Sequence, residues 1–289
     1  MVWTNAVVQG ILLGGLYALF ATGLSLAFGV MRLVNLAHGD LAIFAAFMTL
    51  SISRSLSINP LAALLIVVPA AFVVGFVLQR LVFDRVVGVD PAFQIVATFG
   101  LGIVIQNALL EKYTADTQGL NVGALKTSTI KVNDTIGIGW LPLLTFITAV
   151  VVLGSLALFL QRTKLGRAFR ATSDDADAAR LMGIDIKRVF AVAMALAIAT
   201  VALAGVLFGA RSSFDPFVGP ARLIYAFEAV IIGGLGSLWG TLAGGVTLGV
   251  AQSIGRQINP QWGELFGHFV FLAVLVLRPT GMFGKVQSR

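Results

Sequence analysis

The stretch IIGGLGSLWGTLAGG, residues 231–245, lies inside an apolar run that extends from 223 to 255. A membrane-spanning helix needs about 20 apolar residues, so this run is too long for one span and too short for two full spans with a turn. Backbone that is not helical survives at membrane depth only where protein buries it or where it lines a water-filled path. The run therefore predicts a broken or re-entrant glycine-rich hairpin inside a bundle of transmembrane helices.

The rest of the chain supports this interpretation. Of its 289 residues, 58% are hydrophobic and 11% are charged, whereas soluble domains are about 45–50% apolar and about 25% charged. The apolar runs are continuous, and a barrel would show alternation. The sequence predicts an all-α, polytopic transmembrane helix bundle of about eight or nine spans, forming a single domain over 1–289 in the lipid bilayer. The further runs lie at about 5–31, 33–52, 60–80, 92–111, 140–160, 188–210 and 263–278.

Charge and residue types exclude several function classes. The net charge is +7, and in a membrane protein we attribute it to loops that set topology, so no nucleic-acid partner is expected. The chain has no cysteine, which removes disulfides, thiolate metal sites and a cysteine nucleophile. It also lacks the G-x-x-x-x-G-K-[ST] phosphate loop, so any energy from ATP must come from another subunit. We predict no catalytic site, no metal site and no cofactor.

The distribution of the basic residues predicts an orientation. The segment 161–187 is rich in lysine and arginine, which places it in the cytoplasm. Counting crossings outward from it, with 223–255 entering and returning on one side, puts most of the 20 basic residues inside. The N-terminus is then outside and the C-terminus cytoplasmic. The polar segment 112–139 becomes an external loop, in which residues 127–132 alternate weakly like a strand.

The charged stretch RATSDDADAARLMGIDIKR, residues 170–188, contains a short helix signal. Thr172 or Ser173 is a suitable N-cap, and three aspartates follow in what would be the first turn, where the helix dipole favours negative charge. Gly183 is a natural C′ residue. The pattern predicts a helix over 174–182, about nine residues long and too short to be stable alone.

One side of this predicted helix is small, because Ala176, Ala179 and Gly183 follow one another at helical spacing. Leu181 and Met182 add a short apolar end. Two interpretations remain open from the spacing alone. The helix inserts into a groove on a partner protein, or it packs as an ordinary loop helix against the spans of its own chain.

Polar residues within apolar runs mark candidate positions on a translocation path, since intramembrane polar groups are costly and usually face a cavity or a partner. Asn35 and His38 lie near the start of the second run, where they either face the path or cap the backbone locally. For the nearby Asp40 we favour capping. Glu228 precedes the glycine cluster. It is either interfacial or buried with a partner, for which Arg222 and Arg211 are the nearest candidates in sequence. A path-facing carboxylate there would meet a substrate ammonium group.

The glycines of 231–245 have two compatible interpretations. Gly236, Gly240 and Gly244 follow i, i+4, i+8, the spacing of a helix-packing face. Gly233, Gly234 and Gly236 also permit a kink whose exposed backbone touches substrate, as discontinuous helices do in transporters.

For the short helix over 174–182, a resemblance to a known family favours the interpretation that it docks into a partner protein. The string DAARLMG, residues 177–183, resembles the E-A-A-x-x-x-G segment that permeases of ATP-binding-cassette (ABC) importers present to their ATPase subunits. Asp177 stands where that segment usually has glutamate, while Ala178, Ala179 and Gly183 match. The resemblance implies that these residues, flanked by Arg167 and Arg170, couple the chain to an ATPase.

Four stretches are similar, in the same order, to the branched-chain amino acid permeases of the LivH type. They are GLYALFATGLSLAFGVMRLVNLAHGDL (15–41), GRAFRATSDDADAARLMGID (166–185), AVIIGGLGSLWGTLAGGVTLG (229–249) and RPTGMFG (278–284). The resemblance implies a permease subunit that works by alternating access in a bacterial inner membrane. Its partners would be a second related permease, two ABC ATPase subunits and an extracytoplasmic solute-binding protein. The implied cargo is branched-chain or other apolar amino acids, with urea, amides or short peptides as alternatives.

Two other classes of function have candidate residues in the sequence. A stand-alone secondary carrier driven by an ion gradient needs a buried titratable group, for which Glu228, His38 and Asp40 are the candidates. An intramembrane hydrolase needs a serine with a histidine base in reach, and only Ser237 and His268 invite that hypothesis.

Overall fold

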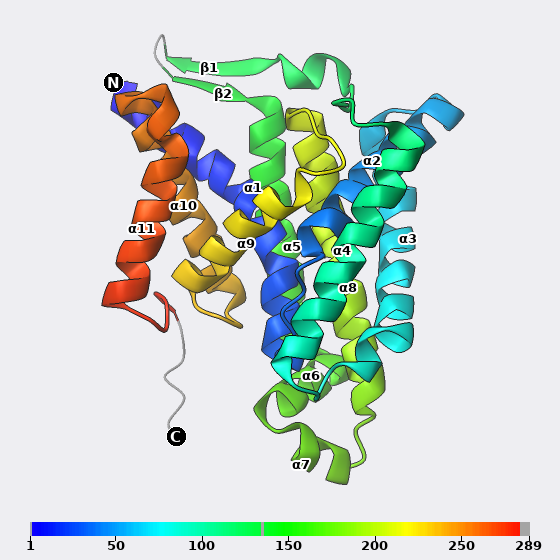
Figure 1. Cartoon of the computed structure of the whole chain (residues 1–289). Helices are drawn as coiled ribbons and strands as arrows, with labels where there is room; N and C mark the ends of the chain where they lie inside the picture. The colour runs from blue at the N-terminus through cyan, green and yellow to red at the C-terminus, as the bar shows by residue number, and fades with distance from the viewer. Residues whose placement is uncertain (1, 134–135, 284–289) are drawn as a thin grey trace.

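The computed structural model describes residues 2–133 and 136–283, in which the chain forms eleven α-helices, three short 3₁₀-helices and one two-stranded hairpin (Figure 1). The α-helices are α1 (Val2–Met31), α2 (His38–Leu56), α3 (Pro60–Leu81), α4 (Pro91–Tyr113), α5 (Trp140–Arg162), α6 (Lys164–Asp174), α7 (Ala176–Leu181), α8 (Ile186–Arg211), α9 (Gly219–Gly233), α10 (Leu238–Ile258) and α11 (Gly263–Leu277). The 3₁₀-helices are η1 (Phe83–Arg85), η2 (Gly123–Lys126) and η3 (Pro260–Trp262), and the strands are β1 (Thr129–Asn133) and β2 (Ile136–Gly139).

The predicted helical membrane bundle is confirmed. Within the described residues, seven helices are long and apolar enough to cross a membrane, and α9 with α10 forms one further pair bent by 117°. The predicted hairpin in the run 223–255 is therefore a broken pair of helices. The clearest departure concerns the second apolar run, because residues 32–37 are not helical and α2 begins only at His38.

Proline and a polar cap set the start of two spans. Asn59 accepts a hydrogen bond from the backbone N–H of Leu61, and Asp90 accepts one from Ala92. In both cases proline occupies the first helical position, where its missing N–H costs no hydrogen bond. Local sequence thus fixes where α3 and α4 begin.

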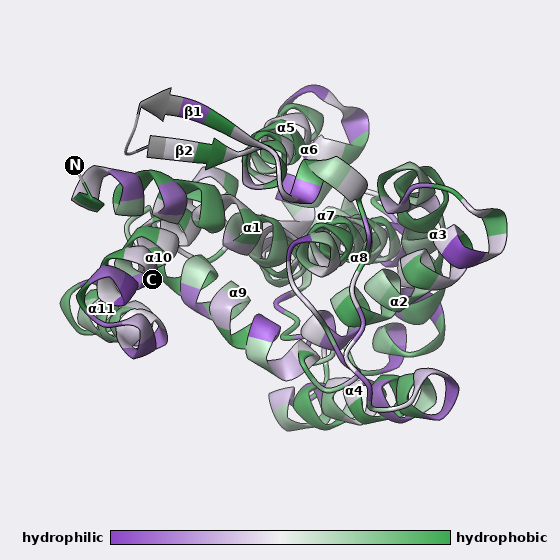
Figure 2. Ribbon diagram, turned by 90° about the horizontal axis from the view of Figure 1, so that it is seen from above, coloured by the Kyte–Doolittle hydropathy of each residue, from purple (hydrophilic) through white to green (hydrophobic). Residues whose placement is uncertain are grey.

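The helices form a bundle with α1 and α8 in the middle (Figure 2). These two are the most buried of the long helices, whereas α3, α4, α5 and α11 leave most of their residues at least partly exposed. Since lipid tails are as apolar as leucine, such exposed faces are the ones that a bilayer covers.

Glycines allow α1 and α10 to cross with their backbones in contact. A Cβ atom on Gly10 would lie 2.6 Å from the Cα of Val250, and one on Gly245 would lie 2.6 Å from the carbonyl oxygen of Gly14. Small residues at such crossings are the usual basis of close helix packing in membranes. The sequence spacing pointed to Gly236, Gly240 and Gly244, of which Gly240 and Gly244 pack closely against α9. It did not indicate the crossing of α1 and α10.

The two ends of the bundle differ. The N-terminus and the β1–β2 hairpin lie at one end, and α6 and α7 project from the other (Figure 1). The hairpin belongs to the predicted external loop and adds a small antiparallel sheet to the all-α fold. This loop is attached to the end of α8, because Gln118 and Phe214 exchange backbone hydrogen bonds of 2.8 Å. Below we call these the hairpin end and the α7 end.

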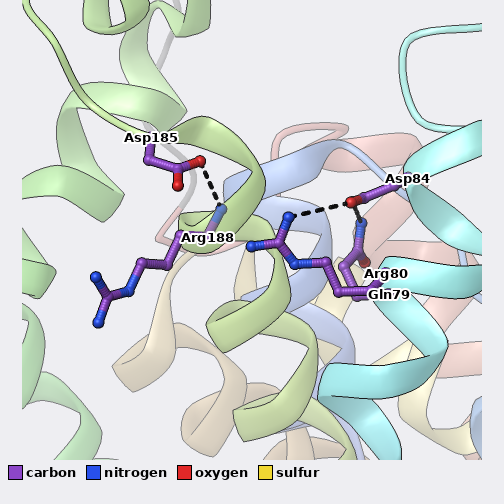
Figure 3. Close-up of polar contacts among 5 residues, drawn as sticks. All are labelled: Gln79, Arg80, Asp84, Asp185 and Arg188. Atoms are coloured by element: carbon purple, nitrogen blue, oxygen red, sulfur yellow. Dashed lines mark hydrogen bonds and ion pairs between the residues drawn. The ribbon is translucent and has the colours of Figure 1, made fainter.

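At the α7 end, the end of α3 lies beside the start of α8 (Figure 3). Asp84 accepts a hydrogen bond of 2.9 Å from Gln79 and forms an ion pair of 3.7 Å with Arg80. Across from them, Asp185 accepts a hydrogen bond from the backbone N–H of Arg188 and caps α8. The cap formed by Asp185 therefore sets the residue at which α8 begins after α7.

Candidate functional site

The charged segment between α5 and α8 contains two helices. The sequence predicted one helix over 174–182 capped by Thr172 or Ser173, and this boundary is wrong. The first helix, α6, continues to Asp174, and Asp175 is extended, with φ −151° and ψ 107°. The Asp175 carboxylate accepts hydrogen bonds from the backbone N–H groups of Asp177 and Ala178, at 2.9 and 3.0 Å. Asp175 is therefore the N-cap of a six-residue α7.

The other end of α7 agrees with the sequence. Gly183 has φ +83°, the left-handed conformation that glycine adopts without strain. Its N–H donates to the carbonyl of Arg180 at 3.0 Å, and the N–H of Ile184 donates to that of Ala179 at 3.1 Å. These two bonds form a Schellman motif, and they confirm Gly183 as the C′ residue of the helix.

The exposed surface of α7 differs from the small face that the spacing indicated. Ala179 is buried within this chain, so that face is turned inward at this position. Asp177, Ala178 and Gly183 are exposed. The apolar end projects furthest, since Leu181 is 89% exposed and Met182 is 83% exposed. Two large apolar side chains thus stand in the open at the tip of the α7 end.

The neighbouring α6 carries the two flanking arginines and touches the centre of the bundle. Arg167 and Arg170 are exposed, and Arg170 donates a hydrogen bond back to the carbonyl of Leu160. Ser173 donates one to the carbonyl of Gly29, near the end of α1. A Cβ atom on Gly29 would lie 3.2 Å from the Cα of Gly236, in the turn between α9 and α10. A continuous path of contacts therefore joins α6 to this turn.

The predicted path residues of the second run have local partners. Asn35 accepts a hydrogen bond of 3.0 Å from the backbone N–H of Ala37, and His38 shares one of 2.9 Å with the carbonyl of Phe20. Both residues are almost fully buried. These are the backbone contacts of the local-capping interpretation.

Asp40 does not cap its helix, against our expectation. Its carboxylate accepts a hydrogen bond of 2.9 Å from Gln106 of α4. Gly102 of α4 and Gly219 at the start of α9 leave the space that the carboxylate fills, because a Cβ atom on either residue would collide with its oxygens. Asp40 therefore ties together the starts of α2 and α9 and the middle of α4.

The glycines of the broken helix pair have different structural roles. A Cβ atom on Gly233 would collide with the carbonyl of Gly240, so Gly233 lies in the contact between α9 and α10. Gly234 and Gly236 form the turn, with φ +99° and +79°. Gly236 is thus a turn residue and no part of the packing face predicted for it.

The last two carbonyl groups of α9, which have no partner within the helix, accept hydrogen bonds from the C-terminal segment. Met282 donates its N–H to the carbonyl of Ile232 at 2.8 Å, and Phe283 donates to that of Gly233 at 3.1 Å. The C-terminal segment after α11 thus closes the break. These two carbonyls are not available to a substrate in this structure.

Glu228 is buried and its partner is His268 of α11. The sequence pointed to Arg222 or Arg211 as the nearest candidates, and this expectation is wrong. Arg222 instead lies over the rings of Phe208 and Tyr225, with its guanidinium carbon 4.7 and 5.3 Å from their centres. The contact between α9 and α11 brings Glu228 to a residue 40 positions away.

The hydrolase hypothesis requires Ser237 and His268 to meet. Ser237 caps α10 by accepting a hydrogen bond of 3.1 Å from the N–H of Gly240. His268 is paired with Glu228 and stacked on Tyr225. Each residue has its own structural partner, and the geometry gives the hypothesis no support.

Comparison with known proteins gives one consistent answer. The family described as "Branched-chain amino acid transport system / permease component" matches residues 6–276. The chain is 27% identical to the high-affinity branched-chain amino acid transport system permease protein BraD of Pseudomonas aeruginosa, over 99% of this chain and 97% of that protein. It is 26% identical to LivH of Escherichia coli, over 96% of this chain and 94% of that protein.

A second permease protein of Escherichia coli, LivM, is 24% identical over 95% of this chain and 69% of its own length. Among solved structures, PsaBC from Streptococcus pneumoniae in complex with Fab has a TM-score of 0.49 and 15% sequence identity over 99% of this chain. That likeness is too distant to carry an argument. With nearly its whole length matched and with seven spans and a bent pair, the chain is a multi-pass membrane protein that belongs to the family of branched-chain amino acid transport permeases.

Proposed function

We propose that the chain is one permease subunit of an ABC importer for branched-chain or other apolar amino acids in a bacterial inner membrane. The names of BraD and LivH assign them to high-affinity branched-chain amino acid transport systems. The chain itself carries no phosphate-binding loop, so separate ATPase subunits supply the energy.

The observation that carries this proposal is the exposed α7. A six-residue helix is too short to be stable alone, yet this one is capped at both ends by Asp175 and by the Schellman turn at Gly183. It presents Leu181 and Met182 to solvent beyond the membrane-spanning helices. A rigid apolar tip of this kind fits a groove on a partner, with Asp177, Ala178 and Gly183 beside it. The exposed Arg167 and Arg170 flank the contact.

Alternating access follows from the contacts behind α7. A partner that holds α7 differently in two states shifts the permease between two conformations by its differential contacts. The path from Ser173 through Gly29 to Gly236 carries this bias from α6 to the turn between α9 and α10. The broken pair is the element that such a movement reaches first.

The remaining partners follow from the same assignment. We infer a second related permease beside this one, for which the likeness to LivM offers a precedent. Two ATPase subunits bind at the α7 end, and a solute-binding protein delivers cargo at the hairpin end. This arrangement puts the N-terminus outside and the C-terminus in the cytoplasm, as the basic residues predict.

The test is purification of the tagged chain from its native membrane in a mild detergent, with its companions identified by mass. We expect stoichiometric ATPase subunits with the natural chain and a loss of at least about tenfold in their recovery with Gly183→Val. A β-branched residue is strained at a positive φ, so the turn after α7 would change. Gly123→Val is the matched control, because Gly123 has φ +65°, has equally open surroundings, and lies in the predicted external loop.

Two results would contradict the proposal. A solitary protein under conditions that preserve other ABC assemblies would remove the ATPase partner. Equal losses in Gly183→Val and Gly123→Val would show that strain in the fold, and not docking, causes the effect.

The second candidate function is a stand-alone ion-coupled carrier, for which the buried pair of Glu228 and His268 would supply the titratable group. The family does not favour it. Glu228→Gln distinguishes the two, because a gradient-driven carrier loses coupling outright, whereas any uptake that remains in an ABC permease still requires ATP.

A further inference from the structure

Several buried polar atoms near the hairpin end have no hydrogen-bond partner among the described residues. They include three donors and one acceptor: Nη1 of Arg211, Nε of Arg222, Nε2 of Gln252 and Oε2 of Glu228. Leaving a buried donor or acceptor unpaired is costly, and most such atoms in folded proteins have a partner. Four of them in one region indicate a group that is absent from the isolated chain.

The four residues are gathered around two tyrosine rings. Tyr17 of α1 and Tyr225 of α9 pack with their ring centres 5.2 Å apart. Arg222 lies over Tyr225, and Gln252 accepts a hydrogen bond of 2.6 Å from the Tyr17 hydroxyl. Arg211 is the last residue of α8, one turn beyond Phe208, whose ring lies under Arg222. The side chains thus come together from four helices, α1, α8, α9 and α10.

Glu228 joins this group through His268. The imidazole ring of His268 stacks on Tyr225, with their centres 6.2 Å apart, and its Nδ1 contacts Oε1 of Glu228. This leaves Oε2 of Glu228 as the unpaired oxygen. Glu228 is 4% exposed and Gln252 is fully buried, so neither group is compensated by solvent.

The charges are separated along α9. Arg222, Tyr225 and Glu228 follow at i, i+3 and i+6, which places them on one side of the helix. The positive end carries free donors and the negative end carries a free acceptor. An anion alone would match only the first, and a cation alone only the second. A small molecule with both charges matches both.

We propose that this cluster binds the zwitterionic end of an α-amino acid. The substrate carboxylate accepts from Arg211, Arg222 and Gln252, and its ammonium group donates to Oε2 of Glu228. The inference rests on the proposed function, and it assigns to this chain a recognition site that is independent of the solute-binding protein. Planar guanidinium groups are the usual partners of carboxylates in such sites.

A hydrogen bond connects the buried cluster to an exposed residue toward the hairpin end. Arg256 lies in the last turn of α10 and Glu264 in the first turn of α11, and both are exposed. Arg256 donates to Oε1 of Gln252 at 3.3 Å, which links the exposed rim to the buried cluster. An amino acid released at the hairpin end would meet the exposed Arg256 and Glu264 first and the buried Glu228 last.

The test uses the complete transporter, with its ATPase subunits, embedded in lipid nanodiscs without the solute-binding protein. Equilibrium binding of labelled L-leucine is competed with unlabelled L-leucine, with 4-methylpentanoate, which lacks the ammonium group, and with 3-methylbutylamine, which lacks the carboxylate. We expect each analogue to compete at least about tenfold less well than leucine, the change that one lost hydrogen bond to a charged group produces. Equal competition by either analogue, or no saturable leucine binding, would overturn the zwitterion site.

Variants then locate the binding. Arg222→Gln and Glu228→Gln should each weaken leucine binding about tenfold or more, with partial recovery in Arg222→Lys and Glu228→Asp, while ATPase recovery stays unchanged. The matched control is Arg54→Gln, which removes an exposed arginine that binds Gln118 outside the cluster. Natural binding in both cluster variants would refute the site.

Uptake by the complete system with its solute-binding protein distinguishes failure of the binding site from failure of the proposed transport function. If the natural transporter takes up leucine and the cluster variants do so at the same rate, the site fails and the proposed function stands. If the natural transporter takes up no amino acid, the proposed function fails and the site fails with it.

Discussion

Glycine serves different purposes at two interruptions of the helical chain, α7 and the region around the turn between α9 and α10. Gly183 ends α7 with nothing within 4 Å of the position that a Cβ atom would occupy. Gly233 and Gly244, around the α9–α10 turn, leave no such space, because a Cβ atom on either would collide with a carbonyl oxygen of the facing helix.

This difference distinguishes glycines that the fold of this chain requires from a region whose exposed surface serves a partner protein. Beside the turn, Gly233 and Gly244 are required by the packing of this chain upon itself. At α7 the chain gains no packing from the glycine, and the large side chains of Leu181 and Met182 point into open space. Substitutions at the first region should therefore change folding, and substitutions at the second should change assembly.

The largest effect is expected for Gly244→Leu. Its side chain would be forced into the backbone of α9, against the carbonyl of Ala229 and 2.7 Å from the N–H nitrogen of Gly233. Overpacking costs about 1–3 kcal/mol where side chains can move, and here the obstacle is backbone. We expect little folded protein, measured as the yield of monodisperse material after detergent extraction.

The control for this substitution is Gly154→Leu in α5, where nothing lies within 4 Å. Its yield should equal that of the natural chain. If Gly244→Leu extracts and melts like Gly154→Leu, the contact between α9 and α10 is not the tight one described, and the comparison between the two regions fails.

A smaller and more selective effect is expected for Leu181→Asp. The side chain is 89% exposed, so the thermal stability of the permease should stay within about 0.5 kcal/mol of its natural value. Recovery of the ATPase subunits should fall about tenfold or more, since an apolar anchor is replaced by a charge. Unchanged recovery would show that the apolar tip of α7 is not the docking surface.

Features that depend on neighbouring residues could be predicted from the sequence. The apolar runs gave the spans, and the rule that glycine occupies C′ gave Gly183. The boundary between α6 and α7 was missed because Thr172, Ser173, Asp174 and Asp175 all favour N-cap positions. Only the helix formed by the preceding residues decides among them, and it extends to Asp174.

Features that depend on distant residues could not be predicted. His268 was singled out for its own chemistry, but nothing in the sequence connects it to Glu228, 40 positions earlier. The same limit applies to the crossing of α1 and α10, where Gly10 faces Val250. A small residue at helical spacing indicates that a close contact exists, and it does not name the helix on the other side.

The smallest effect we predict tests the cap that the sequence misplaced. Asp175→Ala removes the acceptor for the N–H groups of Asp177 and Ala178, and the loss of such a cap costs about 1 kcal/mol. Because α7 has only six residues, this cost should weaken ATPase binding by about fivefold while the spans remain folded. Asp175→Asn supplies the control, since asparagine caps as well as aspartate but carries no charge. Binding by Asp175→Asn that matches the natural chain would assign the effect to the cap, whereas an equal loss in both variants would assign it to the charge facing the ATPase.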